Sequence, residues 1–278
     1  MENLIKPIIV PWDFTVISLY AFEHAVNLSK ILKKDIILLH IVENPSDIES
    51  SFDKLKLKTQ ELKNIYMVNS HPVVKTGNIF ETIKDVSQEY KAEMVVMGTH
   101  GIRGIQKFTG SRALKVISNS KMPFVVIQDK PKSSKFDKII FPIDFRTENK
   151  EKVNYVNYLA INFSAKFLLF KRKVSDKGFK KKIASNLLYV ETFLKNNNVE
   201  YEIFTAEGKL SFEKETVKFS KEQNADMILV LTTRDINFLD YLLAAKEQYV
   251  IANPEKIPVM CINPKPAKLA SGFRASGG

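Results

Sequence analysis

The stretch MVVMGTHGIRGIQKFTGS, residues 94–111, decides how this chain folds. It starts as a short apolar strand that stops at Gly98, continues as a glycine-studded loop, and opens a helical pattern at Gly110 and Ser111. Glycine lets backbone N–H groups approach an anion closely, and a helix N-terminus adds positive charge at the same place. The stretch therefore indicates an α/β protein that cradles a phosphate, or an ordinary glycine-rich turn between strand and helix.

Two well-known phosphate motifs do not fit this stretch. A P-loop needs a Lys-Ser or Lys-Thr pair after its last glycine, and Gly110 is followed by Ser111 and Arg112. The dinucleotide-binding fingerprint follows the first strand of its sheet, whereas this loop comes after several strands.

Short apolar runs alternate with helical patterns on both sides of the loop. Strands are expected near residues 7–11, 35–42, 73–77, 94–97 and 123–127, and helices near residues 18–32, 51–64, 79–90 and 111–119. Such alternation predicts parallel strand pairing in an open sheet covered on both faces.

Together these residues resemble the universal stress protein family over residues 1–130. The shared features are the opening IIVPWDFT, the strand LLHIV, the turn VVMGTHG, the Gly-Ser helix start and the closing strand PFVVIQ. The resemblance implies an α/β fold of the adenine-nucleotide-hydrolase-like type, an open five-stranded parallel sheet with strand order 3-2-1-4-5.

The resemblance also implies a site for an adenine nucleotide, ATP or AMP, with Mg²⁺ accompanying ATP. Family members that bind ATP carry Gly-x-x-Gly, nine residues, and then Gly-Ser or Gly-Thr; here the spacer of residues 102–109 has eight, which shortens the loop around the phosphates. The matching nucleotide-binding positions are Pro11, Asp13, Ile41, Met97, Gly98, Gly101, Gly110, Ser111 and Arg112.

Several of these residues have two interpretations. Asp13 matches the ribose contact, and the alternative is a cap for the following helix; we favour the ribose contact. Ile41 matches the position whose backbone pairs with adenine. Arg112 either donates to a phosphate or points to solvent. His100 has no second histidine or carboxylate cluster beside it in the sequence, so we expect no metal site and no catalytic residue.

The second half of the chain repeats the first. KIIFPIDF at residues 138–145 matches PIIVPWDF at residues 7–14, and further strands are expected at residues 166–170, 199–205, 227–231 and 257–262. We predict a first domain of residues 1–130, a linker near residues 129–135, a second domain of residues 137–265 and a tail of residues 266–278. By resemblance to a family homodimer, the two fifth strands should meet across a pseudo-twofold axis, which protects both sheet edges.

The second half has lost the glycine loop. LTTR at residues 231–234 replaces GTHG, and no glycine stands between Gly208 and Gly272. Side chains at these positions block close backbone approach to a phosphate. Asp144 is retained, and we interpret it as a helix-entry cap. The nucleotide is therefore expected in the first domain.

Composition limits the partners. Lys and Arg total 42 against 31 Asp and Glu, a net charge of +11, and much of the excess lies in residues 166–182. The excess indicates either an anionic partner or a solvated helix face. We favour the solvated face, because no aromatic or arginine pattern of a nucleic-acid module is visible, and we expect no nucleic acid or membrane partner.

The chain carries no disulfide or membrane signal. Cys261 is its single cysteine, so an internal disulfide is impossible. No segment resembles a signal peptide or reaches 18 continuous apolar residues, which predicts a cytoplasmic protein.

Three classes of function remain. Our prediction is a stress-response protein that binds an adenine nucleotide without efficient catalysis. The alternatives are a ligand-free interaction module that acts through its dimer surface, with a homodimer in addition to the internal pseudo-dimer, and a slow ATPase. The ATPase would need a residue that positions the attacking water, and none is evident.

Overall fold

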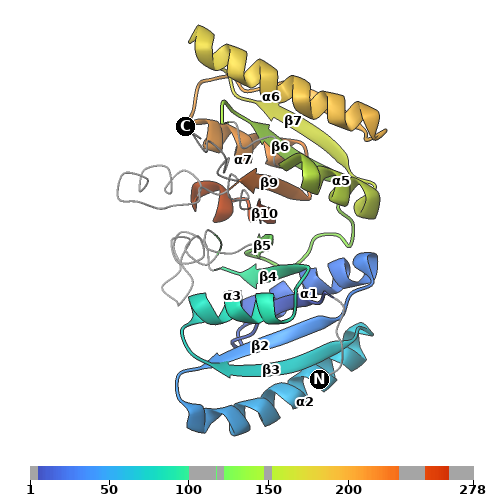
Figure 1. Ribbon diagram of the computed structural model, residues 1–278, viewed down its shortest axis with the longest axis vertical. Coiled ribbons are helices and arrows are strands. Elements are labelled where there is room, and N and C mark those ends of the chain that lie inside the picture. Colours follow the sequence, from blue (N-terminus) through green and yellow to red (C-terminus); the bar gives the residue numbers. More distant parts are fainter. Residues whose placement is uncertain (1–5, 100–116, 118–121, 147–151, 232–247, 263–278) are drawn as a thin grey trace, which may run out of the picture.

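Both halves of the chain share one continuous sheet (Figure 1). A computed structural model describes residues 6–99, 117, 122–146, 152–231 and 248–262. The strands form a ten-stranded sheet in the order β3-β2-β1-β4-β5-β10-β9-β6-β7-β8. Each half has the order 3-2-1-4-5, which confirms the predicted topology. The two expected sheets are, however, joined edge to edge into one.

The elements of the two halves correspond closely. The first half contains β1 (Ile8–Pro11), α1 (Val16–Leu32), β2 (Ile36–Val42), η1 (Pro45–Asp47), α2 (Ile48–Tyr66), β3 (Ser70–Thr76), α3 (Ile79–Glu89), β4 (Met94–Gly98) and β5 (Phe124–Ile127). The second half contains β6 (Lys138–Ile143), α5 (Lys152–Phe163), β7 (Lys166–Lys171), α6 (Lys177–Asn196), β8 (Tyr201–Thr205), α7 (Phe212–Glu222), β9 (Met227–Leu231) and β10 (Val259–Ile262).

Strand register repeats along with strand order. Ile8 of β1 lies opposite Ile36 of β2, and in the second half Ile139 of β6 lies opposite Phe167 of β7. All pairs within a half are parallel. Strands buried on both faces need continuous apolar runs, and this is the pattern of IILLHIV in β2 and KFLLFK in β7.

The two halves meet through their fifth strands. β5 and β10 pair antiparallel, with Val125 opposite Met260 and Val126 opposite Val259. Val125 and Met260 occupy the same place in their halves, so a pseudo-twofold axis passes between them. The expected meeting of the fifth strands is confirmed. The pairing leaves β3 and β8 as the outer strands of the described sheet.

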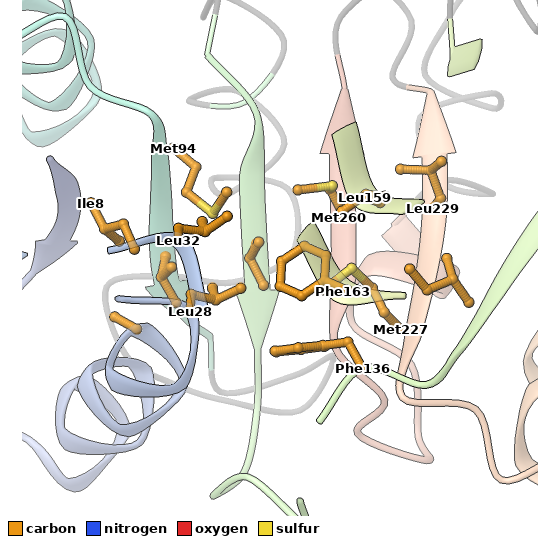
Figure 2. Packing of buried hydrophobic residues seen from close by; sticks show 14 of the residues in the cluster. Ile8, Leu28, Leu32, Met94, Phe136, Leu159, Phe163, Met227, Leu229 and Met260 are labelled. Atoms are coloured by element: carbon orange, nitrogen blue, oxygen red, sulfur yellow. The ribbon is translucent and has the colours of Figure 1, made fainter. Parts of the chain in front are cut away.

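Helices cover both faces of the sheet and bury two apolar layers. α1, α2, α5 and α6 contribute to one layer, and α3 and α7 to the other. The first layer crosses the pseudo-twofold axis, where Leu28, Phe136 and Phe163 lie together (Figure 2). Burying one such side chain is worth about 1.5–3 kcal/mol, so this layer holds the two halves together.

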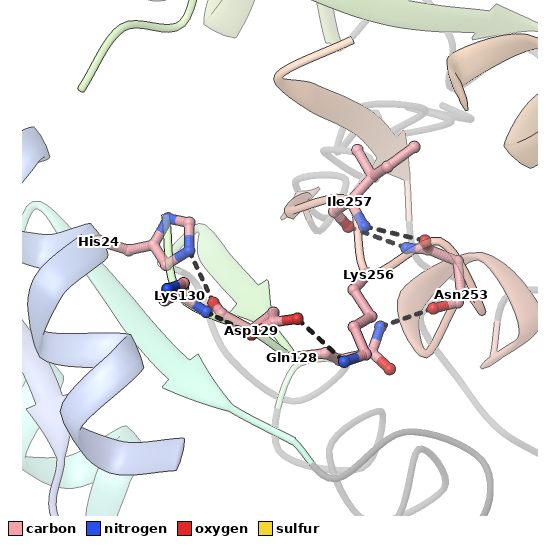
Figure 3. Close-up of polar contacts among 7 residues, drawn as sticks. All are labelled: His24, Gln128, Asp129, Lys130, Asn253, Lys256 and Ile257. Carbon is pink, nitrogen blue, oxygen red and sulfur yellow. Dashed lines mark hydrogen bonds and ion pairs between the residues drawn. The ribbon is translucent and has the colours of Figure 1, made fainter. Parts of the chain in front are cut away.

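Polar contacts fix the segment that connects the halves (Figure 3). The Nε2–H of His24 in α1 donates to the carbonyl oxygen of Asp129 (3.1 Å), and Lys256 Nζ donates to the Asp129 carboxylate (2.9 Å). Gln128 Nε2 donates to the carbonyl oxygen of Asn253 (3.1 Å). Burial lowers the pKa of His24 to about 4, so the ring is neutral at pH 7. The hydrogen bond from Lys256 holds the pKa of the Asp129 carboxyl below its ordinary value.

Three further predictions concern membrane spans, the cysteine and the domain boundaries. None of the helices in the described part of the chain has the length and hydropathy needed to span a membrane. Cys261 is a buried cysteine in β10. The domain boundaries given above stay a prediction, and the tail of residues 266–278 lies outside the described residues.

Candidate functional site

The carboxyl edge of the first-half strands brings together the candidate residues that the structure describes. Pro11 ends β1, Ile41 lies near the end of β2, and Met97 and Gly98 end β4. Because β1 pairs with both β2 and β4, these residues are neighbours along one edge. The strand order changes direction between β1 and β4, and open α/β sheets bind ligands at such a point.

The rest of the predicted site belongs to the glycine loop. Gly101, Gly110, Ser111 and Arg112 lie outside the described residues, as do His100 and most of the helix expected at residues 111–119. Their role at the phosphates therefore stays a prediction.

Asp13 lies just beyond β1 and fixes the start of α1. Its Oδ1 accepts hydrogen bonds from the backbone N–H of Thr15 (3.1 Å) and from Thr15 Oγ1 (2.6 Å). Thr15 is the residue that caps α1, since its Oγ1 accepts from the N–H of Ser18 (3.3 Å). The helix therefore begins at Val16, earlier than expected, and Asp13 supports the cap rather than forming it. No described residue donates to Asp13 Oδ2, and the side chain is exposed.

Gly98 has a structural reason to be glycine. A Cβ at this position would meet the Ile17 side chain and would lie 2.8 Å from the Ile17 carbonyl oxygen. The first turn of α1 thus packs directly on the end of β4. We predicted this glycine from its freedom to approach an anion, and the packing is an independent requirement that the sequence pattern did not reveal.

An aromatic wall that we did not predict stands beside this edge. Phe14 adopts a left-handed conformation (φ 61°) and packs edge-on against the His40 ring, with centroids 5.1 Å apart. His40 Nδ1 lies 2.7 Å from the Trp12 carbonyl oxygen, and Lys54 Nζ lies 4.2 Å from the centre of the Phe14 ring. Lys54 comes from α2, one of several lysines on that helix, so only the tertiary fold singles it out.

Two buried polar atoms follow the strands that flank the change in direction. Trp12 Nε1 and Thr99 Oγ1 have no hydrogen-bond partner among the described residues, although the two residues are only 3% and 0% exposed. Buried polar groups are nearly always hydrogen-bonded, and leaving one without a partner costs about 1–3 kcal/mol. These atoms fit a site that is completed by a bound molecule.

The equivalent aspartate of the second half, Asp144, differs from Asp13 in burial and in its contacts. Asp144 is 6% exposed, and its Oδ2 accepts from Arg146 Nε at 2.7 Å while its Oδ1 accepts from the Arg146 N–H at 3.0 Å. Asn186 Nδ2 donates to the Asp144 carbonyl oxygen at 2.9 Å. Asp144 therefore holds Arg146. Residues 147–151 lie outside the described residues, so the predicted role of Asp144 as a helix-entry cap stays a prediction.

Side chains fill the rest of the second-half edge. The register places Phe170 opposite Pro142 as it places Leu39 opposite Pro11, so Arg172 occupies the place of Ile41. The Arg172 guanidinium lies 5.4 Å from the centre of the Phe145 ring, and Phe145 stacks on Phe179 of α6 at 4.4 Å. The lysine-rich segment does have aromatic and arginine contacts, which the sequence hid because they join three separate segments.

No metal cluster stands at either edge as far as the structure describes it. Among the described residues, no group of three or more His, Cys, Asp or Glu side chains could hold a metal ion. Mg²⁺ accompanying ATP is commonly held by the phosphates and one or two side chains, so this finding is compatible with either nucleotide.

Comparisons with known proteins agree with the fold. The model of the universal stress protein family matches residues 4–128. The chain is 31% identical over 147 residues to universal stress protein MJ0531 of Methanocaldococcus jannaschii, which covers 47% of this chain and 86% of that protein. The chain therefore belongs to the universal stress protein family.

Solved structures extend the likeness in fold to both halves. A universal stress protein from Archaeoglobus fulgidus DSM 4304 is similar with a TM-score of 0.73 and 16% identity, covering 94% of this chain and 97% of that one. A functionally unknown protein, PA1789 from Pseudomonas aeruginosa PAO1, is similar with a TM-score of 0.62 and 12% identity, covering 94% of each chain. At these identities the likeness concerns the fold alone.

Proposed function

We propose that the protein binds one adenine nucleotide per chain, ATP or AMP, at the carboxyl edge of β1 and β4, and serves in stress response without efficient catalysis. The observation that carries the proposal is the difference between Asp13 and Asp144. Asp13 is exposed and keeps Oδ2 for an incoming donor, whereas Asp144 is buried and engaged by Arg146.

The described residues would serve a nucleotide in distinct ways. Asp13 Oδ2 can accept hydrogen bonds from ribose hydroxyls, and the backbone of Ile41 can pair with the adenine edge. Pro11 is partly exposed and offers apolar surface at the same edge, and Met97, 1% exposed, belongs to the packing beneath it. Lys54 supplies a positive charge close to the aromatic wall. The phosphates would depend on the glycine loop, where Gly101, Gly110, Ser111 and Arg112 are the predicted donors.

Support for one site in each chain comes from the filled edge of the second half. A nucleotide there would have to displace Arg172 from Phe145 and break the ion pair between Asp144 and Arg146. The Asp144 side chain is 9% exposed and that of Arg146 34%, so breaking this partly buried pair would leave the Asp144 carboxylate without this guanidinium donor. Among its described residues the first half has no ion pair at Asp13, although Lys54 lies over Phe14 much as Arg172 lies over Phe145.

The proposal is tested by identifying small molecules released from freshly purified protein by mass spectrometry. We expect ATP or AMP from the wild type and from Asp144→Asn, and a strongly reduced amount from Asp13→Asn, with melting temperatures recorded for all three proteins. Absence of any nucleotide, together with no binding on its addition, would favour a ligand-free interaction module. Steady hydrolysis of ATP that is lost in Asp13→Asn would instead make the protein a slow ATPase.

Two sequence-based expectations accompany this proposal. A cytoplasmic location and a homodimer in addition to the internal pseudo-dimer are both compatible with it. Fractionation of cells and light scattering of the purified chain would test them.

A further inference from the structure

A second candidate site lies in the other half, lined by residues of β7, β8 and α7 and of the segment between β8 and α7. It is a pocket of about 330 Å³, within the size range of small-molecule sites. Its main lining residues are Phe170, Phe204, Leu210, Lys218, Phe219 and Glu222. None of these residues belongs to the candidate nucleotide site, so the inference is independent of the proposed function.

The floor of the pocket is built from phenylalanine rings. Phe170 of β7 and Phe219 of α7 are stacked, with centroids 4.5 Å apart and planes at 11°. Phe204 of β8 packs against Phe219 at 4.8 Å with a tilt of 52°. Aromatic rings prefer offset-stacked or tilted partners and add about 0.5–1.5 kcal/mol per pair beyond the area buried. Such a floor suits another aromatic ring.

One wall of the pocket is held rigidly by a buried carboxylate. Glu215 Oε1 accepts from the N–H groups of Lys209 (2.7 Å) and Leu210 (2.9 Å), and Oε2 accepts from the N–H of Gly208 (3.1 Å). Burial raises the pKa of Glu215, but the backbone N–H groups together outweigh burial and hold the pKa below its usual range. The carboxylate is therefore occupied in shaping the loop and does not face a ligand as a free charge.

Comparison with the first half shows which side chains differ at the position of this pocket. Leu39 pairs with Val73 in the first half, and Phe170 pairs with Phe204 at the same place in the second. The floor of the pocket therefore has aromatic side chains where the first half has aliphatic ones.

A salt bridge also crosses the corresponding place in the first half. Lys75 Nζ of β3 donates to Glu89 Oε2 at the end of α3, at 3.0 Å. Glu222 holds the matching place at the end of α7, but Ala206 stands where Lys75 stood. Among its described residues, the second half therefore lacks a counterpart of the ion pair that joins the edge strand to the helix in the first half.

The charges around the rim favour an uncharged occupant. Lys209 pairs with Glu207 at 2.8 Å and Lys218 lies 3.7 Å from Glu222, so each base of the rim has an acid beside it. Counting Glu215, the described lining holds three carboxylates against two lysines. Glu215 is engaged by backbone N–H groups, so neither an unpaired lysine nor an unpaired carboxylate of the rim is left to select an ion. We propose that this pocket binds a small, planar, uncharged aromatic compound that stacks on Phe204 and Phe219.

The test uses the full chain and the neutral fluorescent probe N-phenyl-1-naphthylamine. Its emission should rise saturably with about one probe per chain. Ala206→Lys, which restores the lysine of the first half next to Glu222, should weaken binding about tenfold by covering the floor. Leu210→Trp changes an exposed side chain at the mouth and should also weaken it, so the test survives if Ala206→Lys fails to fold.

A matched control places the same charge elsewhere on the strand. Ile203→Lys lies on β8 at an exposed position outside the pocket lining and should leave probe affinity unchanged. Equal affinity in wild type, Ala206→Lys and Leu210→Trp would overturn the proposal, as would absence of saturable binding to the wild type. Tighter binding of the anionic probe 1-anilinonaphthalene-8-sulfonate at the same place would overturn the preference for an uncharged compound.

Discussion

Replacing His24 with glutamine should remove a pH-dependent part of the stability. His24 is 4% exposed in α1, and its Nε2–H donates to the carbonyl oxygen of Asp129 in the connecting segment. Burial lowers the pKa of His24 from 6.5 to about 4, and the hydrogen bond and charge of Asp129 offset this only in part. Glutamine can place an N–H donor at a similar distance from the backbone without titrating.

The sign and size of the effect follow from this pKa. Below pH 6.5 the unfolded chain takes up a proton at His24, whereas the folded chain does not until about pH 4. Unfolding therefore becomes easier as the pH falls through this window. A pKa difference of one corresponds to about 1.4 kcal/mol. Protonation of His24 in the unfolded chain should therefore lower the free energy of unfolding by about 3 kcal/mol between pH 7 and pH 4.

Urea unfolding of wild type and His24→Gln at several pH values between 7 and 4.5 measures this contribution. Acid effects from carboxylates are common to both proteins, so the difference between them isolates His24. Asn27→Ala is the matched control, since Asn27 Nδ2 donates from the same helix to the Ser133 carbonyl oxygen (3.2 Å) and does not titrate. Its effect should be independent of pH. Identical pH dependence in wild type and His24→Gln would refute the reasoning.

Three further outcomes are expected. Gly98→Ala should lower the free energy of unfolding by about 1–3 kcal/mol, because its Cβ crowds the Ile17 backbone; an unchanged urea midpoint would contradict this. Glu215→Gln should cost about 2 kcal/mol and speed hydrogen exchange at the Leu210 amide, because one acceptor oxygen becomes a donor. If the first half binds adenine nucleotides, their addition should change the fluorescence emission of Trp12 saturably. An unchanged emission up to millimolar nucleotide would count against the site.

Much of the fold could be predicted because the second half of the chain repeats the sequence pattern of the first. The alternation of apolar runs with helical patterns predicted parallel strands, and the match of residues 7–14 with residues 138–145 predicted a second copy. The strand order and the meeting of β5 with β10 came from the resemblance to the universal stress protein family. Buried parallel strands leave a strong signal in a sequence, since each must be apolar along its whole length. Helix starts were less exact, since α1 depends on the cap at Thr15.

The chemistry of the edges was harder to predict, because it depends on contacts between distant segments. Nothing in the local sequence shows that Asn186 donates to the Asp144 carbonyl oxygen, or that Phe179 stacks on Phe145. The interpretation of the lysine-rich segment as a solvated face agrees with the exposure of Lys180, Lys181 and Lys182. Lys54 also reaches the first-half edge only through the packing of α2.

Titration calorimetry of the full chain with ATP, with and without Mg²⁺, and with AMP tests the central claim most directly. The account predicts saturable binding with one nucleotide per chain, lost or greatly weakened in Asp13→Asn and kept in Asp144→Asn. A stoichiometry near two, or loss of binding in a folded Asp144→Asn protein, would contradict the assignment of the site to the first half. No heat from either nucleotide at millimolar concentration would contradict nucleotide binding itself.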